Sequence, residues 1–308
     1  MKIGVFISET WGPASNLNQV RERARQAETM GFDSGWVPYI PRSLDAMMAL
    51  QAAGSVTDSI ELGSAVIPTY LFHPLALARQ AYSLRGEIGR RFTLGLGCSQ
   101  QVVIEKSHGL PFTRPAQHVR EYLEILQQSA EQSGHMNYHG ELFNLDGPFL
   151  TPGGGDMQIL IGAIGPLMLK VAGELADGTI ATMSDEGAIE REIVPRITAA
   201  ALAAGRPAPR VAAVIPVHVT DDADTAKQMA LEHFSVYEKL PRYKRMIDLG
   251  DQQHPAGLCV IGNEQQVRQR LQRFADAGLT DFIASPFTFG ETTAQQRLRT
   301  LKCLSTYS

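Results

Sequence analysis

The segment between residues 162 and 165 has the composition of an anion-binding turn. It consists of Gly162, Ala163, Ile164 and Gly165, follows the apolar run Gln158 to Ile161, and precedes Pro166. A glycine turn that joins a strand to a helix beginning with proline presents free backbone N–H groups and the positive end of the helix dipole. This turn is therefore the best phosphate-binding candidate in the sequence, although glycine also serves tight turning alone at such positions.

A second candidate ligand site lies on the expected strand Phe92 to Gly97, which continues into Cys98 and Ser99. Gly95 and Gly97 are two residues apart and therefore lie on the same face of the strand. Missing side chains on an inward face allow a flat ligand to approach the backbone closely, whereas a glycine bulge without a ligand is the structural alternative. We favour the ligand interpretation.

The histidines and cysteines predict no metal site. No HExxH or CxxC spacing occurs, and Cys98, Cys259 and Cys303 are odd in number and far apart, which also argues against a disulfide framework. His73 and His218 fall near expected strand ends and are kept as candidate catalytic residues. His118 lies within a helical stretch and is expected to be a surface or packing residue.

Strand and helix patterns alternate along the chain and would bring these candidates together. A strand–helix alternation predicts parallel strands covered by helices. The expected strands are Ile3 to Ser8, Ser34 to Pro38, Ile60 to Ile67, Phe92 to Gly97, Gln158 to Ile161, Thr179 to Met183, Val211 to Val219 and Asp281 to Ser285. The expected helices are Asn18 to Met30, Asp45 to Val56, Leu75 to Ile88, Ala116 to Ser133, Pro166 to Leu175, Ile189 to Ala204, Asp222 to Glu238, Arg242 to Leu249, Val267 to Ala277 and Thr293 to Leu304.

Eight alternations favour a single-domain (β/α)8 TIM barrel over residues 1–308, with a small hairpin inserted after the fourth unit. The hairpin is expected from Met136 to Tyr138 and from Leu142 to Leu145, followed by a loop from Gly147 to Gly155. A doubly wound open sheet is the alternative architecture, but no GxGxxG motif follows the first strand. In a barrel, the chemistry would lie at the C-terminal ends of the strands.

The overall composition excludes several classes of protein. The chain has 308 residues, 44% of them hydrophobic and 19% charged, which is typical of a globular protein. Lys and Arg total 28 against 32 for Asp and Glu, so the basic excess typical of nucleic-acid binding is missing. No apolar run is long enough for a membrane helix, and the first residues lack the features of a signal peptide. We therefore expect a cytoplasmic enzyme with a small-molecule substrate and without nucleic-acid or membrane partners.

Taken together, three ordered segments resemble the luciferase-like monooxygenase superfamily, and most closely its branch of deazaflavin-dependent oxidoreductases. The segments are GSAVIPTYLFHP, RFTLGLGCS, and ILIGAIGP with AGELADG, and the match extends over nearly the whole chain. The resemblance implies a barrel that holds the deazaflavin coenzyme F-420 (F420), or alternatively FMN, at its C-terminal mouth. We also allow for a homodimer.

The resemblance assigns residues to this coenzyme site. It implies a non-proline cis peptide bond between Ala65 and Val66, forming a bulge behind the ring. The contacts on the phosphate side fall on the turn Gly162 to Gly165, and the strand before it contributes Gly97, Cys98 and Ser99.

The chain also departs from the family pattern. Several deazaflavin-dependent dehydrogenases carry Asp-His after the second strand and many close relatives carry Ser-His after the fourth, whereas this chain has Pro38-Tyr39 and Ser99-Gln100. Alternation along the second strand predicts that Tyr39 faces the pocket, where a neutral phenol could donate a proton. Tyr39 is therefore our first catalytic candidate, with an apolar wall as its alternative role, and Ser99 and His73 are weaker candidates.

Three functions remain open from the sequence. The first is an oxidoreductase that transfers a hydride between a deazaflavin and a small organic substrate, with the protein supplying positioning and electrostatics. The second is an FMN-dependent monooxygenase, which oxygen consumption would distinguish. The third is a non-catalytic flavin-binding protein on the same barrel, which would bind the coenzyme without turnover.

Overall fold

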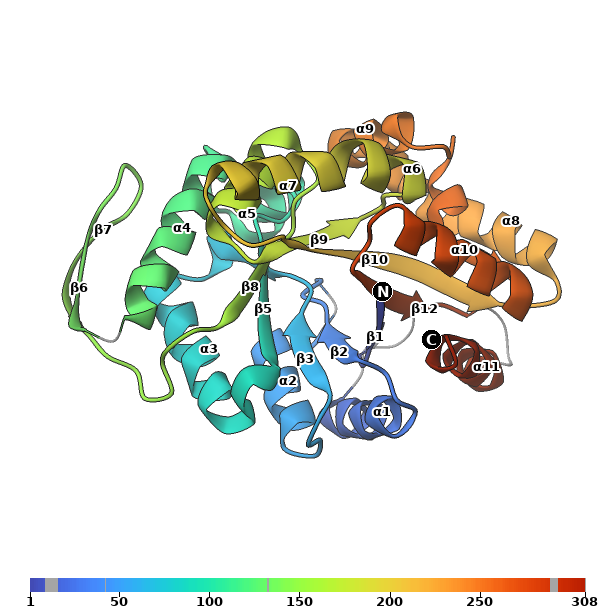
Figure 1. Ribbon diagram of the computed structural model, residues 1–308, viewed down its shortest axis with the longest axis horizontal. Helices are drawn as coiled ribbons and strands as arrows, with labels where there is room; N and C mark the ends of the chain where they lie inside the picture. Colours follow the sequence, from blue (N-terminus) through green and yellow to red (C-terminus); the bar gives the residue numbers. More distant parts are fainter. Residues whose placement is uncertain (9–15, 42, 132, 289–292, 308) are drawn as a thin grey trace.

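The computed structural model describes all residues except 9–15, 42, 132, 289–292 and 308. Within this part of the chain, eight parallel strands pair in a closed ring, because β9 and β10 pair with each other and β12 returns to β1 (Figure 1). The (β/α)8 barrel is therefore confirmed over the open sheet. The ring consists of β1 (Lys2–Phe6), β2 (Ser34–Val37), β3 (Glu61–Ser64), β5 (Phe92–Gly97), β8 (Gln158–Ile161), β9 (Gly178–Thr182), β10 (Arg210–Val219) and β12 (Asp281–Pro286).

Helices surround the ring, as Figure 1 shows. Local residues define their starts: Asn16 and Asn263 each form a capping box with the glutamine three residues later, and Pro74 and Pro166 occupy first-turn positions. The described helices are α1 (Leu17–Thr29), α2 (Ala46–Gly54), α3 (Pro74–Ile88), α4 (Pro115–Ala130), α5 (Pro166–Leu175), α6 (Glu186–Ala188), α7 (Val194–Ala203), α8 (Ala223–Phe234), α9 (Pro241–Leu249), α10 (Glu264–Asp276) and α11 (Thr293–Ser305).

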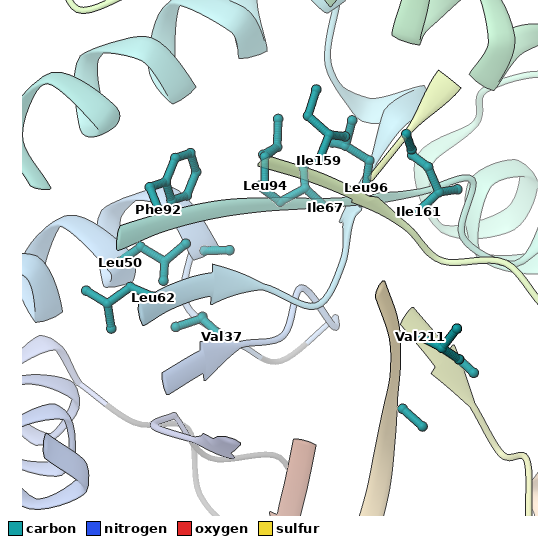
Figure 2. Packing of buried hydrophobic residues seen from close by; sticks show 14 of the residues in the cluster. Val37, Leu50, Leu62, Ile67, Phe92, Leu94, Leu96, Ile159, Ile161 and Val211 are labelled. Atoms are coloured by element: carbon teal, nitrogen blue, oxygen red, sulfur yellow. The ribbon is translucent and has the colours of Figure 1, made fainter. Parts of the chain in front are cut away.

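The outer core lies between the strands and the helices. Side chains that point outward from β5 and β8 pack there in one large apolar cluster, together with the inner faces of the helices. Figure 2 shows part of this layer, including Leu94, Leu96, Ile159 and Ile161. Burial of this kind stabilises the fold by about 25 cal/mol for each Å² of apolar surface removed from water.

The alternate residues of the strands fill the inside of the barrel. Phe6, Trp36, Leu160, Ile180, Ala212 and Ile283 form this inner cluster. Trp36 is fully buried, and its Nε1 donates a hydrogen bond to Ser34 Oγ at 2.8 Å. Gly4 and Gly63 make room for the indole, since a Cβ atom at Gly63 would lie only 2.3 Å from the Trp36 ring. The indole therefore occupies the barrel between its two ends.

The inserted hairpin is longer than the sequence predicts. It pairs β6 (Gly134–His139) with β7 (Asn144–Phe149), so Gly147 and Pro148 are strand residues rather than loop residues. Leu142 and Phe143, which were expected in the second strand, lie in the connecting turn instead. A strand of an isolated hairpin tolerates glycine and proline because one of its edges needs no partner. The hairpin projects beside α4 (Figure 1), and the buried Glu121 carboxylate of that helix accepts hydrogen bonds from three backbone N–H groups of the connecting turn.

The expected strand Ile60 to Ile67 is interrupted, and one further short strand was not predicted. β4 (Ile67–Pro68) continues the third strand after a break and pairs with β5, and β11 (Val260–Gly262) pairs with the end of β10 outside the ring. Segments of two or three residues are too short to show a periodic pattern, so these strands depend on their neighbours. The remaining expected elements agree with the structure to within a few residues at their ends.

Candidate active site

A cavity of about 530 Å³ opens at the C-terminal ends of the strands. This is the end of a barrel where enzymes of this fold place their chemistry. Its lining is mostly apolar and comes from segments far apart in the sequence. The lining residues include Tyr39, Asp45, Ala65, Val66, Ser99, Gln100, Met183, Tyr237 and Tyr243.

A smaller cleft of about 100 Å³ adjoins this cavity. The two form one continuous site with a wide part and a narrow part, because they share Ala65, Val66, Ser99, Gln100, Thr182 and Tyr243. The residues that line the narrow part alone are Gly97, Cys98, Gly162, Ile164, Ile180 and Arg242. This narrow part brings together the two glycine segments identified in the sequence.

The peptide bond between Ala65 and Val66 is cis, as predicted. The glycines of β5 adapt to this break in the third strand, because a Cβ atom at Gly95 would lie 1.8 Å from the Ser64 carbonyl oxygen and one at Gly97 would lie 2.6 Å from the Val66 side chain. The space at Gly95 therefore belongs to the neighbouring strand rather than to a ligand, which corrects our interpretation of that glycine. Gly97 still lines the narrow cleft.

Two lining residues adopt a backbone conformation that side chains disfavour. Ser99 has φ of 61° and Met183 has φ of 54°, and both follow the end of a barrel strand. Such left-handed conformations cost roughly 1–3 kcal/mol each and cluster at functional sites, where the surrounding structure holds them. The strain thus coincides with the cavity that the strand ends surround.

The turn before α5 leaves room for a ligand. Gly165 is the N-cap of this helix and supplies no side-chain cap, so the first-turn N–H groups have no side-chain acceptor. Its φ of −99° would suit any residue, and a Cβ atom there would meet no heavy atom within 4 Å. This open space beside uncapped N–H groups is compatible with an anion, and phosphate binding at the turn stays a prediction.

Helix α9 adds positive charge beside this turn. Arg245 forms an ion pair with the buried carboxylate of Glu192, and its Nη1 donates a hydrogen bond to the Ile164 carbonyl oxygen at 3.3 Å. Arg242, one turn earlier, lines the narrow cleft, where its Nη1 lies 3.4 Å from Cys98 Sγ. The side chain of Tyr243 forms a hydrogen bond with that of Gln100.

Tyr39 lies in the cavity lining, where alternation along the second strand placed it. Burial raises the pKa of its phenol above the ordinary value, and the nearby Asp45 carboxylate raises this pKa further. The phenol is therefore neutral at pH 7. Its ring packs edge-to-face on Phe72 at a centroid distance of 5.9 Å, which restricts its orientation.

The sequence profile of the luciferase-like monooxygenases matches residues 1–281. The chain belongs to the luciferase-like monooxygenase family. A 5,10-methylenetetrahydromethanopterin reductase of Methanopyrus kandleri is 30% identical to it over 315 residues, covering 88% of this chain and 89% of the reductase. The reductase of the same name from Archaeoglobus fulgidus is 34% identical over 188 residues, which cover 60% of this chain and 54% of that protein.

Solved structures agree with this luciferase-like fold. An F420-dependent secondary alcohol dehydrogenase in complex with an F420–acetone adduct superposes with a TM-score of 0.81 at 18% identity, covering 98% of this chain and 97% of that one. The oxygenating constituent of 3,6-diketocamphane monooxygenase from Pseudomonas putida, in complex with FMN, superposes with a TM-score of 0.79 at 17% identity, covering 100% and 97%. At these identities the similarity shows the fold alone.

The histidines of this luciferase-like chain lie away from the described lining of the two pockets, apart from His108. His73 is exposed and caps α3, where its Nδ1 accepts a hydrogen bond from the Leu75 N–H at 3.3 Å. His118 is buried and stacks on Tyr70, and His218 is buried with its Nδ1 2.9 Å from the Phe287 carbonyl oxygen. The buried position of His118 is explained by its packing on Tyr70, which agrees with the packing role expected from the sequence.

No group of three or more metal-ligating side chains occurs among the residues described. In the same part of the chain, no helix is both long and apolar enough to cross a bilayer.

Sequence reasoning missed Arg242, Tyr243 and Gln100 as site residues. α9 was predicted as a helix but was given no role. It is an extra helix between the β10 and β12 units, and additional helices of a barrel often cover the C-terminal mouth. This helix does not belong to the repeating strand–helix pattern, and that departure was the sequence feature that could have indicated a role for α9 at the site.

Proposed function

We propose that this protein is an oxidoreductase that transfers a hydride between the deazaflavin coenzyme F420 and a small organic substrate. One observation carries the proposal: a wide apolar cavity at the barrel mouth continues into a narrow cleft that ends at an uncapped glycine turn. A flavin-type coenzyme also has two parts, a flat apolar ring and a side chain that ends in an anionic phosphate. The ring would match the apolar cavity, and the phosphate would match the narrow cleft. Relatives that match most of this chain, or share its fold, are named for F420-dependent reactions.

The residues assigned from the sequence would hold such a coenzyme in two groups. Ala65 and Val66 line both parts of the site and would support the ring, together with Gly97, Cys98 and Ser99. The turn Gly162 to Gly165 would bind the phosphate through the backbone N–H groups near the start of α5, because the Gly162 N–H already donates to the Leu96 carbonyl oxygen. Ala163 is buried as a whole residue and would support the shape of the turn.

When bound, the deazaflavin would supply the hydride-transfer chemistry. The protein would exclude water through the apolar lining and orient the substrate. Tyr39 is our candidate for the residue that exchanges a proton with the substrate heteroatom. Its raised pKa keeps the phenol protonated at neutral pH, so it could act as the donor.

The other two catalytic candidates are supported to different degrees. Ser99 lines both parts of the site, so its hydroxyl could orient the substrate or the coenzyme. His73 has support only from the sequence, since its ring caps α3. We therefore rank Ser99 second to Tyr39 and His73 third.

The test is a titration of the purified protein with F420 and, separately, with FMN, followed by anaerobic reduction of candidate substrates with reduced coenzyme. We expect F420 to bind and to change its absorbance on turnover. Preferential FMN binding with oxygen consumption would instead establish a monooxygenase. Tight coenzyme binding without turnover of any substrate would favour a non-catalytic flavin-binding protein.

A further inference from the structure

Arg242 is a positive charge in the narrow cleft that has weak partners only. Its Nη1 lies 3.4 Å from Cys98 Sγ, and its guanidinium lies 5.6 Å from the centroid of the Phe112 ring. A thiol is a weak acceptor, and an aromatic face offsets only part of a cation's lost hydration. Among the residues that the structure describes, no carboxylate pairs with Arg242.

Two neighbouring cations on α9 differ from Arg242 in this respect. Arg245 is paired with Glu192, and Lys244 is paired with Asp248 at 2.9 Å. Of these three, only Arg242 lines the narrow cleft. A half-buried guanidinium without a carboxylate is unfavourable unless an anion completes it.

The cleft places Arg242 beside a second, independent anion-attracting feature. Gly162 and Ile164 line the same cleft and belong to the turn whose following helix lacks a side-chain cap. Arg245 holds α9 against this turn through the Ile164 carbonyl oxygen. The turn that leads into the uncapped start of α5 and the guanidinium of α9 therefore border the same space of about 100 Å³.

We propose that Arg242 is a specificity-determining residue that pairs with the phosphate of the coenzyme and makes binding depend on that phosphate. The inference rests on the proposed function for the identity of the ligand. A guanidinium presents paired donors that match phosphate oxygens, and such charge-assisted hydrogen bonds are stronger than neutral ones. The turn before α5 would then bind the phosphate from one side and the added helix α9 from another.

The experiment compares two ligands that differ in the phosphate. The dissociation constants of the deazaflavin ribityl phosphate, which is F420 without the groups attached beyond its phosphate, and of the same deazaflavin with its ribityl chain ending in a hydroxyl are measured by fluorescence titration. The proteins are the wild type, Arg242→Gln, Arg242→Lys and Lys244→Gln. We expect Arg242→Gln to weaken binding of the phosphate-bearing ligand roughly ten- to a hundredfold and to leave the phosphate-free ligand within about twofold. Arg242→Lys should recover part of the affinity, and Lys244→Gln should match the wild type.

Equal weakening of both ligands by Arg242→Gln would overturn the inference, because it would indicate packing rather than phosphate recognition. No weakening of either ligand would overturn it as well. Circular dichroism of each variant checks that the fold persists, and Arg242→Lys provides a readout if Arg242→Gln is unstable.

The outcome also separates this inference from the proposed function. If the wild type binds neither F420 nor FMN, the proposed function fails and the inference fails with it. If FMN binds instead, the same comparison with FMN and riboflavin decides the role of Arg242, because the phosphate chemistry is shared. If the wild type binds F420 and Arg242→Gln binds it equally well, the inference alone fails.

Discussion

The two ends of the barrel interior are built from the same alternating strand positions with opposite chemistry. At the N-terminal end, Arg210 donates to Asp281 Oδ1 at 2.6 Å and to Glu61 Oε1 at 2.8 Å, and Gln158 joins the same network. Each of these residues begins a barrel strand. Because each of these charged side chains has partners of opposite charge, the network stabilises the N-terminal end of the barrel and fills it.

At the C-terminal end, residues an even number of positions further along these strands are small or apolar. Ala65, Gly162, Val214 and Ser285 are examples, and all line the wide cavity or the narrow cleft. Trp36 separates the two ends. The same face of a strand can therefore hold a stabilising network at its start and an open, strained site at its end. This is possible because the successive layers of inward-pointing side chains along the barrel do not share residues.

The largest effect is expected at the C-terminal mouth of the barrel, from Tyr39→Phe. If the phenol is the proton donor, turnover should fall by ~10²- to 10⁴-fold, while coenzyme affinity and stability stay unchanged. Steady-state kinetics with a substrate that the wild type reduces would measure this. Tyr237→Phe, in the same cavity lining, is the matched control. Turnover of Tyr39→Phe within a fewfold of the wild type would reduce Tyr39 to a wall residue.

The opposite end is tested by Arg210→Met. The Asp281 side chain is only 3% exposed, so removing its cation should lower the free energy of unfolding by about 3–5 kcal/mol. Urea denaturation measures this, and coenzyme affinity should not change. Arg114→Met breaks an exposed ion pair with Glu141 and should cost less than about 1 kcal/mol. A similar small loss for Arg210→Met would contradict the role of the network.

A pH series tests the aromatic packing around Tyr70. Burial lowers the pKa of His118 to about 4, so the folded protein keeps this ring neutral while the unfolded chain takes up a proton near pH 6.5. Its contribution to stability is therefore complete above pH 6.5 and falls by about 3 kcal/mol as the pH drops towards 4.

His118→Phe should flatten this part of the pH dependence, measured as free energies of unfolding in urea from pH 7 to pH 4. His139→Gln, an exposed histidine of the hairpin, should keep the wild-type curve. Identical curves for the wild type and His118→Phe would show that the ring of His118 is not held neutral by the fold.

The smallest expected effect concerns the turn before α5. Gly165→Val should weaken coenzyme binding by about tenfold, since its side chain would fill the open space beside the backbone N–H groups. The fold should persist, because the backbone of Gly165 is extended. Gly147→Val, at an equally open position in the hairpin, is the control in the same titration. Unchanged affinity of Gly165→Val would place the phosphate elsewhere.

Local patterns in the sequence were sufficient for the barrel and for one side of the site. The alternation of strands and helices, the capping residues and the glycine turns are encoded by neighbours in the chain, so they predicted the order of the elements and the positions of Tyr39 and of residues 162–165. The family resemblance added the cis bond between Ala65 and Val66. The role of each side chain in catalysis stays a prediction.

Tertiary structure decided which distant residues meet. Cys98 and Arg242 are 144 positions apart, and nothing in the periodicity of either segment indicates that they share a cleft. The same is true of Gly95, whose missing side chain makes room for the Ser64 carbonyl oxygen of a neighbouring strand. A sequence pattern specifies the face on which a residue lies, whereas its partner on that face depends on strand register and on how the added helix α9 packs across the mouth.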